Sequence, residues 1–316
     1  MKRVLITMFF IILMIIPAKS FAEDIQIKIN GTRIETADPI VVGNGRIMVR
    51  YNSFCKQLGI HAEWDIYTRE LTYKKERGYL KLKLEAQSAV INDQYINMEH
   101  PIFIQNYILY VPLRFVAESF NASVEWDGDT RTVNITSAPI VFLGDSITEN
   151  YQLNEYFKDV NVNMINKGVN ANITLDVLRR LDDVVSLKPS KIFIMIGTND
   201  VWGGFPDEFI ISNYTSILDR IKQECPFTKI YVQSIVPMGA NQLAANIMAS
   251  IEKIDRLNNE LAAISEVNGY NYIDIGVLFK DSKGELAPVY TTDGIHLSAK
   301  AYELWTQTIK SMVIDD

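Results

Sequence analysis

The chain has 316 residues, of which 48% are hydrophobic, enough for a sizeable core and too many for a mostly disordered protein. The formal net charge of −7 disfavours nucleic acid as a partner, because phosphate contacts need a basic face. The two cysteines, Cys55 and Cys225, are too few for a disulfide framework and favour buried free thiols. A chain of this length fits two domains comfortably.

The first 22 residues differ in composition from the rest. Two basic residues precede an apolar run at residues 4–16, and two small residues, Ser20 and Ala22, follow it. This order predicts a secretory signal peptide over residues 1–22, because the run is shorter than the roughly 20 residues that span a bilayer. An uncleaved membrane anchor is the alternative. Both interpretations predict a protein that is secreted or associated with the cell envelope.

Residues 23–137 are expected to form short strands joined by turns, with one or two short helices. The sequence also repeats itself: "VRYNSFCKQLGIHAEWDIYTRELTY" at residues 49–73 aligns with "VPLRFVAESFNASVEWDGDTRTVNI" at residues 111–135, an offset of 62 residues. A repeat at a fixed offset indicates one supersecondary unit used twice. We therefore expect a smaller α+β repeat domain in this half.

Each copy of the repeat predicts a short helix with an apolar face. Phe54 and Leu58 lie four residues apart in the first copy, as do Val116 and Phe120 in the second. A tryptophan then occupies the same position in both copies, and an Asp-x-x-Thr sequence after it predicts a turn into the next strand. Matching positions favour tryptophans packed in the core, and a ligand platform is the alternative.

The second copy carries a resemblance to a known family. The segment "YVPLRFVAESFNASVEWDGDTRTVNIT" at residues 110–136 resembles the copper amine oxidase N-terminal-like domain. The first copy is degenerate, because it lacks the residues that match Pro112 and Leu113. The resemblance does not bring a copper site with it, since His61 and His100 belong to no clustered ligand set. We expect this half to be a binding or presentation module, with cell-wall association as one use.

The pattern changes after "SAPI" at residues 137–140. Continuous apolar runs that end in glycine, "PIVFLG" and "KIFIMIG", are typical of parallel strands covered on both faces. Three further strands are expected at "MIN", "KIYVQSIVP" and "NYIDIG", with amphipathic helices between them. This alternation predicts an α/β domain over residues 138–316, built on a flavodoxin-like, doubly wound parallel sheet.

Polar residues follow the predicted strands, at the sheet edge where such folds bind ligands. Ser146 comes directly after the first strand, and His296 is the single histidine of this half. Asp293, three residues before His296, is close enough in sequence to orient its imidazole. A serine, a base and an orienting carboxylate are the requirements of nucleophilic serine catalysis. A solvated histidine at the start of a helix is the alternative.

Four blocks in this half, "FLGDSIT", "NKGVN", "IGTND" and "DGIHLS", resemble those of the SGNH/GDSL hydrolase superfamily. Within it they look most like small esterases of the platelet-activating-factor acetylhydrolase-like type. The resemblance implies that Ser146 is the nucleophile, His296 the general base and Asp293 its orienting partner. It also implies an oxyanion hole formed by the backbone N–H groups of Ser146 and Gly168 and by the side chain of Asn199. No metal or organic cofactor is implied.

The implied reaction is ester hydrolysis through an acyl-enzyme. The expected substrate is an acyl ester, with O-acetyl groups on cell-envelope or extracellular polysaccharide as the first expectation. Trp202, Phe205 and Met238 are candidates for the wall of the acyl pocket and, equally, for the core. A lipase or lysophospholipase-type esterase, an O-acyltransferase and a non-catalytic envelope-binding protein are the alternatives.

Overall fold

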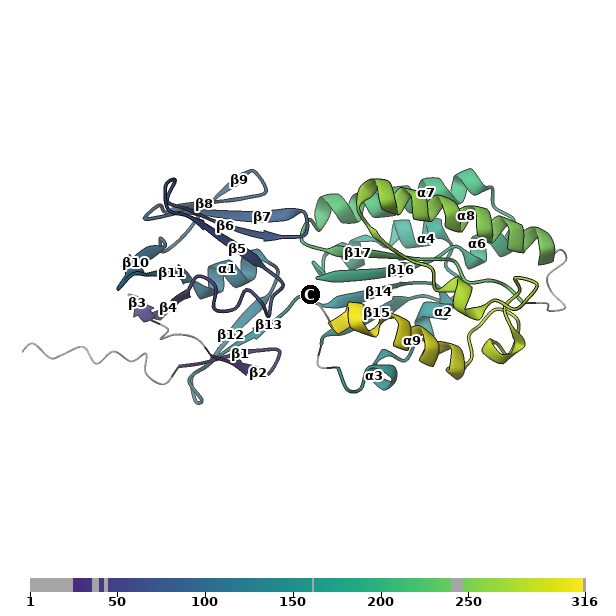
Figure 1. The fold of residues 1–316 in the computed structure, drawn as a ribbon, viewed down its shortest axis with the longest axis horizontal. Coiled ribbons are helices and arrows are strands. Elements are labelled where there is room, and N and C mark those ends of the chain that lie inside the picture. The colour runs from purple at the N-terminus through teal and green to yellow at the C-terminus, as the bar shows by residue number, and fades with distance from the viewer. Residues whose placement is uncertain (1–24, 36–39, 43–44, 161, 240–246, 315–316) are drawn as a thin grey trace, which may run out of the picture.

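The structure is a computed structural model that describes residues 25–35, 40–42, 45–160, 162–239 and 247–314. The predicted signal peptide lies outside these residues. Figure 1 shows a β-rich N-terminal half beside an α/β half, with β13 (Thr132–Thr136) ending just before β14 (Ile140–Gly144) begins. Within the described part of the chain, no helix combines the length and the apolarity needed to cross a membrane.

The described part of the N-terminal half forms three sheets around helix α1 (Leu113–Ser119). The first contains β12 (Ser123–Asp127), β13, β1 (Gln26–Ile29) and β2 (Thr32–Ile34), in that order. The second contains β10 (Phe103–Gln105), β11 (Ile108–Pro112), β4 (Arg46–Arg50) and β3 (Ile40–Val42). The third is an antiparallel meander of β5 (His61–Asp65), β6 (Glu70–Lys75), β7 (Gly78–Lys83), β8 (Ser88–Ile91) and β9 (Gln94–Asn97).

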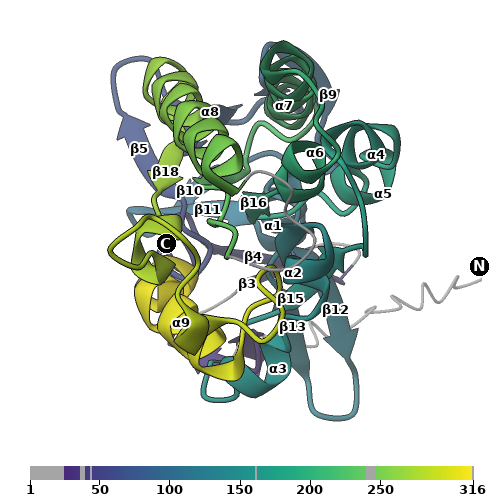
Figure 2. The ribbon, with the colours of Figure 1, turned by 90° about the vertical axis from the view of Figure 1, so that its right-hand side faces the viewer.

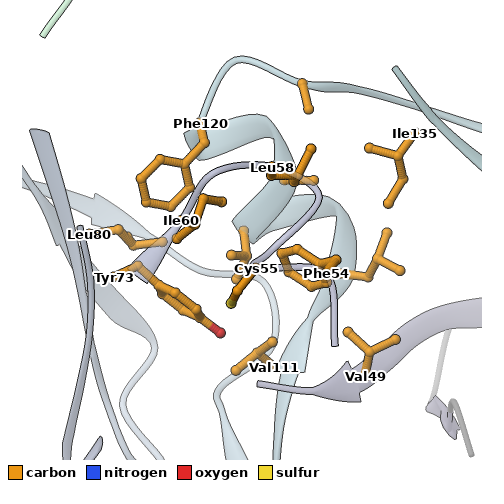
Figure 3. Close-up of a cluster of buried hydrophobic side chains, with 14 of the residues drawn as sticks. Val49, Phe54, Cys55, Leu58, Ile60, Tyr73, Leu80, Val111, Phe120 and Ile135 are labelled. Carbon is orange, nitrogen blue, oxygen red and sulfur yellow. The ribbon is translucent and has the colours of Figure 1, made fainter. Parts of the chain in front are cut away.

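The two copies of the repeat differ at the predicted helix. The second copy forms α1, whereas residues 51–59 of the first copy form turns, so the helix predicted there is wrong. Asn52 and Ser53 stand at the start of this segment, and both side chains compete for backbone hydrogen bonds and favour turns over helix interiors. The predicted apolar face is nevertheless right, because Phe54 and Leu58 are both buried in the core of this half (Figure 3).

The predicted turns after the two tryptophans form as expected. Oδ1 of Asp65 accepts the backbone N–H of Thr68 at 3.2 Å, and Oδ1 of Asp127 accepts that of Thr130 at 3.1 Å. These Asx-type turns join β5 to β6 and β12 to β13 as antiparallel pairs. The repeat is therefore conserved in its hairpin and altered in its helix.

The α/β half contains a parallel sheet of five strands in the order β15 (Met164–Gly168), β14, β16 (Lys191–Met195), β17 (Lys229–Gln233) and β18 (Asn271–Ile273). Numbered along the chain, this is the 2-1-3-4-5 order of flavodoxin-like folds, which confirms the predicted architecture. From β14 the chain first adds β15 on one side, and it then adds β16, β17 and β18 on the other side of β14. Ligands of such folds bind at that switch point, outside the carboxyl ends of the strands.

Helices cover both faces of this sheet (Figure 1). On one face lie α4 (Thr174–Arg179), α5 (Asp182–Val185), α7 (Asp207–Glu224) and α8 (Ile247–Asn268), and on the other α3 (Leu153–Tyr156) and α9 (Ala299–Ile314). The sheet has a hydrophobic core on each face, and alternate residues of β14 point into one or the other. Leu143 packs on the side of α7 and α8, and Phe142 packs on the side of α9. Phe142 stacks on Phe193 at 5.0 Å between ring centroids, and Phe193 stacks on Tyr231 at 4.4 Å.

The two halves share a buried contact. Phe227, in the loop before β17, belongs by sequence to the α/β half but is buried in the core of the N-terminal half. Gly78 lies so close to it that a Cβ there would come within 2.2 Å of the phenyl ring. The neighbouring Arg77 donates its backbone N–H to the carbonyl of Pro226 at 3.3 Å. The N-terminal half is thus docked at the amino ends of the strands, away from the edge where ligands bind.

Candidate active site

The residues of the predicted site lie at the carboxyl ends of the parallel strands. Ser146 is the first residue of α2 (Ser146–Glu149), which follows β14, and Asn199 lies in α6 (Thr198–Trp202), which follows β16. His296 lies in the loop before α9. Figure 2 looks onto this end of the sheet, where α2, α6 and that loop come together. The site therefore occupies the switch point between β14 and β16.

Ser146, His296 and Asp293 form a continuous chain of hydrogen bonds. Oγ of Ser146 lies 3.0 Å from Nε2 of His296, and Nδ1 of His296 lies 2.7 Å from Oδ2 of Asp293. Burial raises the pKa of Asp293, but hydrogen bonds from the His296 ring and from the backbone of His296 and Ile295 outweigh it and lower the pKa to about 2. The ionised carboxylate accepts the proton of Nδ1, which leaves the lone pair of Nε2 facing the serine hydroxyl.

The loop before α9 holds the imidazole in place. Oγ1 of Thr291 donates to the carbonyl of His296 at 2.7 Å and accepts the N–H of Gly294 at 2.9 Å. Gly294 has a φ of 86°, a left-handed conformation that a residue with a Cβ adopts only at a cost. The other carboxylate oxygen of Asp293, Oδ1, accepts the backbone N–H of His296 at 2.8 Å. The base and its carboxylate are therefore fixed by one short, internally bonded loop.

Asp145 supports the turn that carries the serine. It precedes α2, and its side chain accepts the backbone N–H of Ile147 at 3.0 Å as a helix cap. The side chain is buried, and this burial raises the pKa of Asp145 to about 7. The carboxyl therefore stabilises the turn that carries Ser146 and is not a member of the hydrogen-bond chain from Ser146 to Asp293.

Side chains of helix α6 form hydrogen bonds to the loop that follows β15. Nδ2 of Asn199 donates to the carbonyl of Asn172 at 3.0 Å. The buried carboxylate of Asp200 accepts the backbone N–H of Thr174 at 3.0 Å and its hydroxyl at 2.6 Å. Two adjacent residues of α6 thus fix the position of this loop relative to the end of β16.

Gly168 has a different setting from the one that the resemblance implies. Its backbone N–H donates to Oδ1 of Asn166 at 2.8 Å, so the structure gives that group a partner within its own loop. A Cβ at Gly168 would lie 2.1 Å from the backbone nitrogen of Glu149, so glycine allows the close approach of α2. Residues 169–172 form the turn that follows, with Ala171 at a φ of 59°, and the carbonyl of Asn172 in this turn accepts from the side chain of Asn199.

Arg180, at the end of α4, forms hydrogen bonds to three segments around the site. One guanidinium nitrogen donates to the carbonyls of Gly144 at 3.0 Å and Lys167 at 2.9 Å, and Nε donates to Oδ1 of Asn172 at 2.7 Å. The arginine thus bridges the ends of β14 and β15 and the next loop. No local pattern in the sequence indicates this role, since an arginine in an amphipathic helix is usually a solvated surface residue.

The three candidate pocket residues have different surroundings. Met238 is buried in the core between the sheet and α8, and Phe205 packs against the same core and stacks on Phe209 at 5.1 Å. Trp202, at the end of α6, is 46% exposed. Met238 and Phe205 therefore belong to the hydrophobic core rather than to an open pocket wall. Of the three residues, Trp202 alone has an exposed aromatic face near Asn199.

Comparisons with known proteins agree with this geometry. The family described as "GDSL-like Lipase/Acylhydrolase family" matches residues 142–304, just over half of the chain, and the "Copper amine oxidase N-terminal domain" matches residues 28–135. Both resemblances found in the sequence are thereby confirmed. The chain belongs to the GDSL-like lipase/acylhydrolase family, and this membership supports a serine esterase.

Three known proteins illustrate the similarity. An acetylxylan esterase of Geobacillus stearothermophilus is 24% identical over 159 residues, which cover 48% of this chain and 71% of that protein. An N-acylneuraminate cytidylyltransferase of Escherichia coli is 24% identical over 178 residues, which cover 55% of this chain but only 40% of that protein. The crystal structure of a GDSL-like lipase of Bacteroides thetaiotaomicron has a TM-score of 0.51 at 23% identity, over 56% of this chain and 87% of that one. This last likeness is one of fold.

Proposed function

We propose that the protein is a secreted serine esterase that removes acetyl groups from carbohydrate through an acyl-enzyme. The observation that carries the proposal is the hydrogen-bond chain from Ser146 through His296 to Asp293, at 3.0 and 2.7 Å. The secretory signal expected in residues 1–22 would bring the enzyme to the cell envelope or beyond it.

In the first half of the reaction, Oγ of Ser146 attacks the ester carbonyl while Nε2 of His296 takes the hydroxyl proton. The ionised Asp293 stabilises the imidazolium that forms. When the tetrahedral intermediate collapses, the imidazolium gives the proton to the departing sugar oxygen, and an acetyl-serine remains. Water, deprotonated by His296, then attacks this ester and releases acetate. The serine recovers its proton from the histidine.

Two donors can meet the negative charge that develops on the carbonyl oxygen. The backbone N–H of Ser146, at the first position of α2, has no partner within its helix. The side chain of Asn199 carries a second amide hydrogen besides the one given to Asn172. The backbone N–H of Gly168, which the resemblance implies as a further donor, is engaged by Asn166. Each such donor contributes about 2.7–4 kcal/mol to transition-state stabilisation.

The open surroundings of the triad favour an ester of a large alcohol. The side chains of His296 and Asp293 are 37% and 49% exposed, so the histidine base lies at an open surface that a polymer can approach. Trp202 offers an exposed ring near Asn199, on which a sugar can stack. The similarity to an acetylxylan esterase supports the same class of substrate.

The test compares p-nitrophenyl acetate, butyrate and octanoate with acetylated xylan as substrates of the protein and of Ser146→Ala. Turnover should be highest on acetate, and acetylated xylan should release acetate. Ser146→Ala should abolish both activities and labelling by a fluorophosphonate, and the matched variant Ser298→Ala should keep them. Substantial turnover by Ser146→Ala would refute the nucleophile. A preference for octanoate would instead support a lipase-type esterase.

A further inference from the structure

A cavity of about 690 Å³ opens in the N-terminal half, and its lining residues all come from that half. Residues of β4, α1 and β12 line it, together with the segment after β9. Its volume lies within the range of about 300–1,000 Å³ that is typical of small-molecule sites. The proposed esterase mechanism does not use it.

Trp126, in β12, is the aromatic residue that distinguishes this cavity. It lines the cavity and is 47% exposed, so the core position expected for it is wrong. Its counterpart in the first copy of the repeat, Trp64, is half-buried against the core of this half. The same position in the same hairpin can therefore bury its ring, and the exposure of Trp126 is particular to the second copy. A large exposed aromatic at the wall of a cavity is a feature of binding sites.

Two ion pairs line the cavity around Trp126. Arg46 forms an ion pair with Glu99, and all four of Arg46, Glu99, Arg114 and Glu118 line the cavity. Arg114 lies 3.0 Å from Glu118 and also donates to the carbonyl of Val124 at 2.6 Å. Glu125 and Arg131 also line the cavity, so its three arginines balance its three glutamates. The wall therefore offers hydrogen-bond donors and acceptors without a strong field of either sign.

We propose that this cavity binds a neutral oligosaccharide, with Trp126 as the platform on which one sugar ring stacks. The apolar face of a pyranose matches an indole ring, and its hydroxyl groups match the donors and acceptors of the paired arginines and glutamates. An anionic ligand would need an excess of positive charge that the paired wall does not provide. The inference does not depend on the esterase activity, because it uses no residue of the catalytic half.

The binding test uses the whole chain as its Ser146→Ala variant, with xylohexaose and chitohexaose as probes and polygalacturonate as an anionic control. Calorimetry should detect binding of at least one neutral probe. Trp126→Ala in that background should weaken it about tenfold, the effect of losing roughly 1.4 kcal/mol of stacking and burial. Trp126→Phe should retain most of the affinity, because a ring remains. Tyr107→Ala, at a fully exposed aromatic outside the cavity, is the matched control and should bind as the parent does.

Three outcomes would overturn the proposal. Neither neutral probe binds; a neutral probe binds equally well to Trp126→Ala; or polygalacturonate binds at Trp126 and the neutral probes do not. Should Trp126→Ala lose its thermal unfolding transition, acrylamide quenching decides. The bound probe should protect the parent's fluorescence more than that of Trp126→Phe, which lacks the stacked indole, and equal protection of the two would overturn the proposal. Ester hydrolysis by the protein with Ser146 intact is measured separately, so failure of either proposal is seen independently.

Discussion

The ring of Phe227 packs edge-on against the ring of Phe120 at 4.8 Å between centroids, although the two residues come from opposite halves of the chain. Phe227 lies in the loop that precedes β17, and Phe120 follows α1 in the N-terminal half. The contact makes a residue of the α/β half part of the N-terminal core. The two halves are therefore joined by buried apolar surface as well as by the chain itself.

We expect Phe227→Ala to destabilise the protein by about 3–5 kcal/mol, the usual cost of emptying a phenylalanine site in a core. Its effect on kcat with p-nitrophenyl acetate at 25 °C should be small, since the triad lies at the other end of the sheet. Urea unfolding and steady-state kinetics measure the two quantities. Val267→Ala, at a position 86% exposed, is the control and should leave both unchanged. An unchanged unfolding midpoint for Phe227→Ala would contradict the buried contact.

Residues 139–316 alone should fold and hydrolyse p-nitrophenyl acetate, because every residue of the triad and of the oxyanion hole lies within them. This fragment exposes Phe227, so it should self-associate, and Phe227→Ser in the fragment should restore a monomer in size-exclusion chromatography. A soluble, folded fragment without activity would mean that the N-terminal half contributes to the site.

Asp293→Asn should lower kcat by a factor on the order of 10⁴, because the amide neither stabilises the imidazolium nor selects its tautomer. With the pKa of Asp293 at about 2, the carboxylate stays ionised throughout the working range. Protonation of Asp293 should therefore contribute nothing to any change in the parent's kcat for p-nitrophenyl acetate between pH 5 and 8. A kcat for Asp293→Asn within tenfold of the parent would contradict the role given to the carboxylate.

Arg180→Lys should lower kcat for p-nitrophenyl acetate about 100-fold, because an ammonium group cannot bridge Gly144, Lys167 and Asn172 in one geometry and small displacements of reacting groups are costly. The KM should change little, since the arginine touches no part of the triad. Arg179→Lys is the matched control, one residue earlier and 70% exposed, and should behave as the parent. Equal kcat values for the two variants would remove the positioning role of Arg180.

Asp145→Asn should change how stability depends on pH. Burial raises the pKa of Asp145 to about 7, so between about pH 3.9, where an ordinary aspartate ionises, and pH 7 the unfolded chain releases a proton that the folded protein keeps. The parent therefore loses stability from this group as the pH rises through that window, and the loss is complete above pH 7. Asparagine has no such proton and can still accept the N–H of Ile147.

Urea unfolding at pH 5, 6, 7 and 8 measures this effect. The stability of Asp145→Asn relative to the parent should rise between pH 5 and 7 and then level off. Asp129→Asn, in an exposed turn of the other half, should track the parent at every pH. A constant difference between Asp145→Asn and the parent across the series would contradict the raised pKa.

The buried strands of the α/β half and the three residues of the proposed triad could be predicted because their signals are local. The buried strands are continuous apolar runs, and the histidine base was found because His296 is the single histidine after residue 100. Ser146 and Asp293 follow from their places beside a strand end and beside that histidine. The structure brings all three together as expected.

The remaining features depend on contacts between distant segments, which a single sequence does not display. Arg180 and Phe227 act on loops and cores far from their own helix or strand. The setting of Gly168 depends on how closely α2 approaches β15. Trp64 and Trp126 share one sequence context, yet they differ in exposure because the segments packed around the two copies differ.

The bond between Ser146 and His296 joins residues 150 positions apart, one after the first strand of the α/β sheet and the other before its last helix. Contacts of such sequence separation form late, because the intervening chain must be ordered before its ends can meet. Ester hydrolysis will therefore report on completion of folding: a partly assembled sheet, however compact, will have no turnover. The time course of regained activity after dilution from denaturant gives the rate of the last assembly step, which spectroscopic probes of secondary structure would miss.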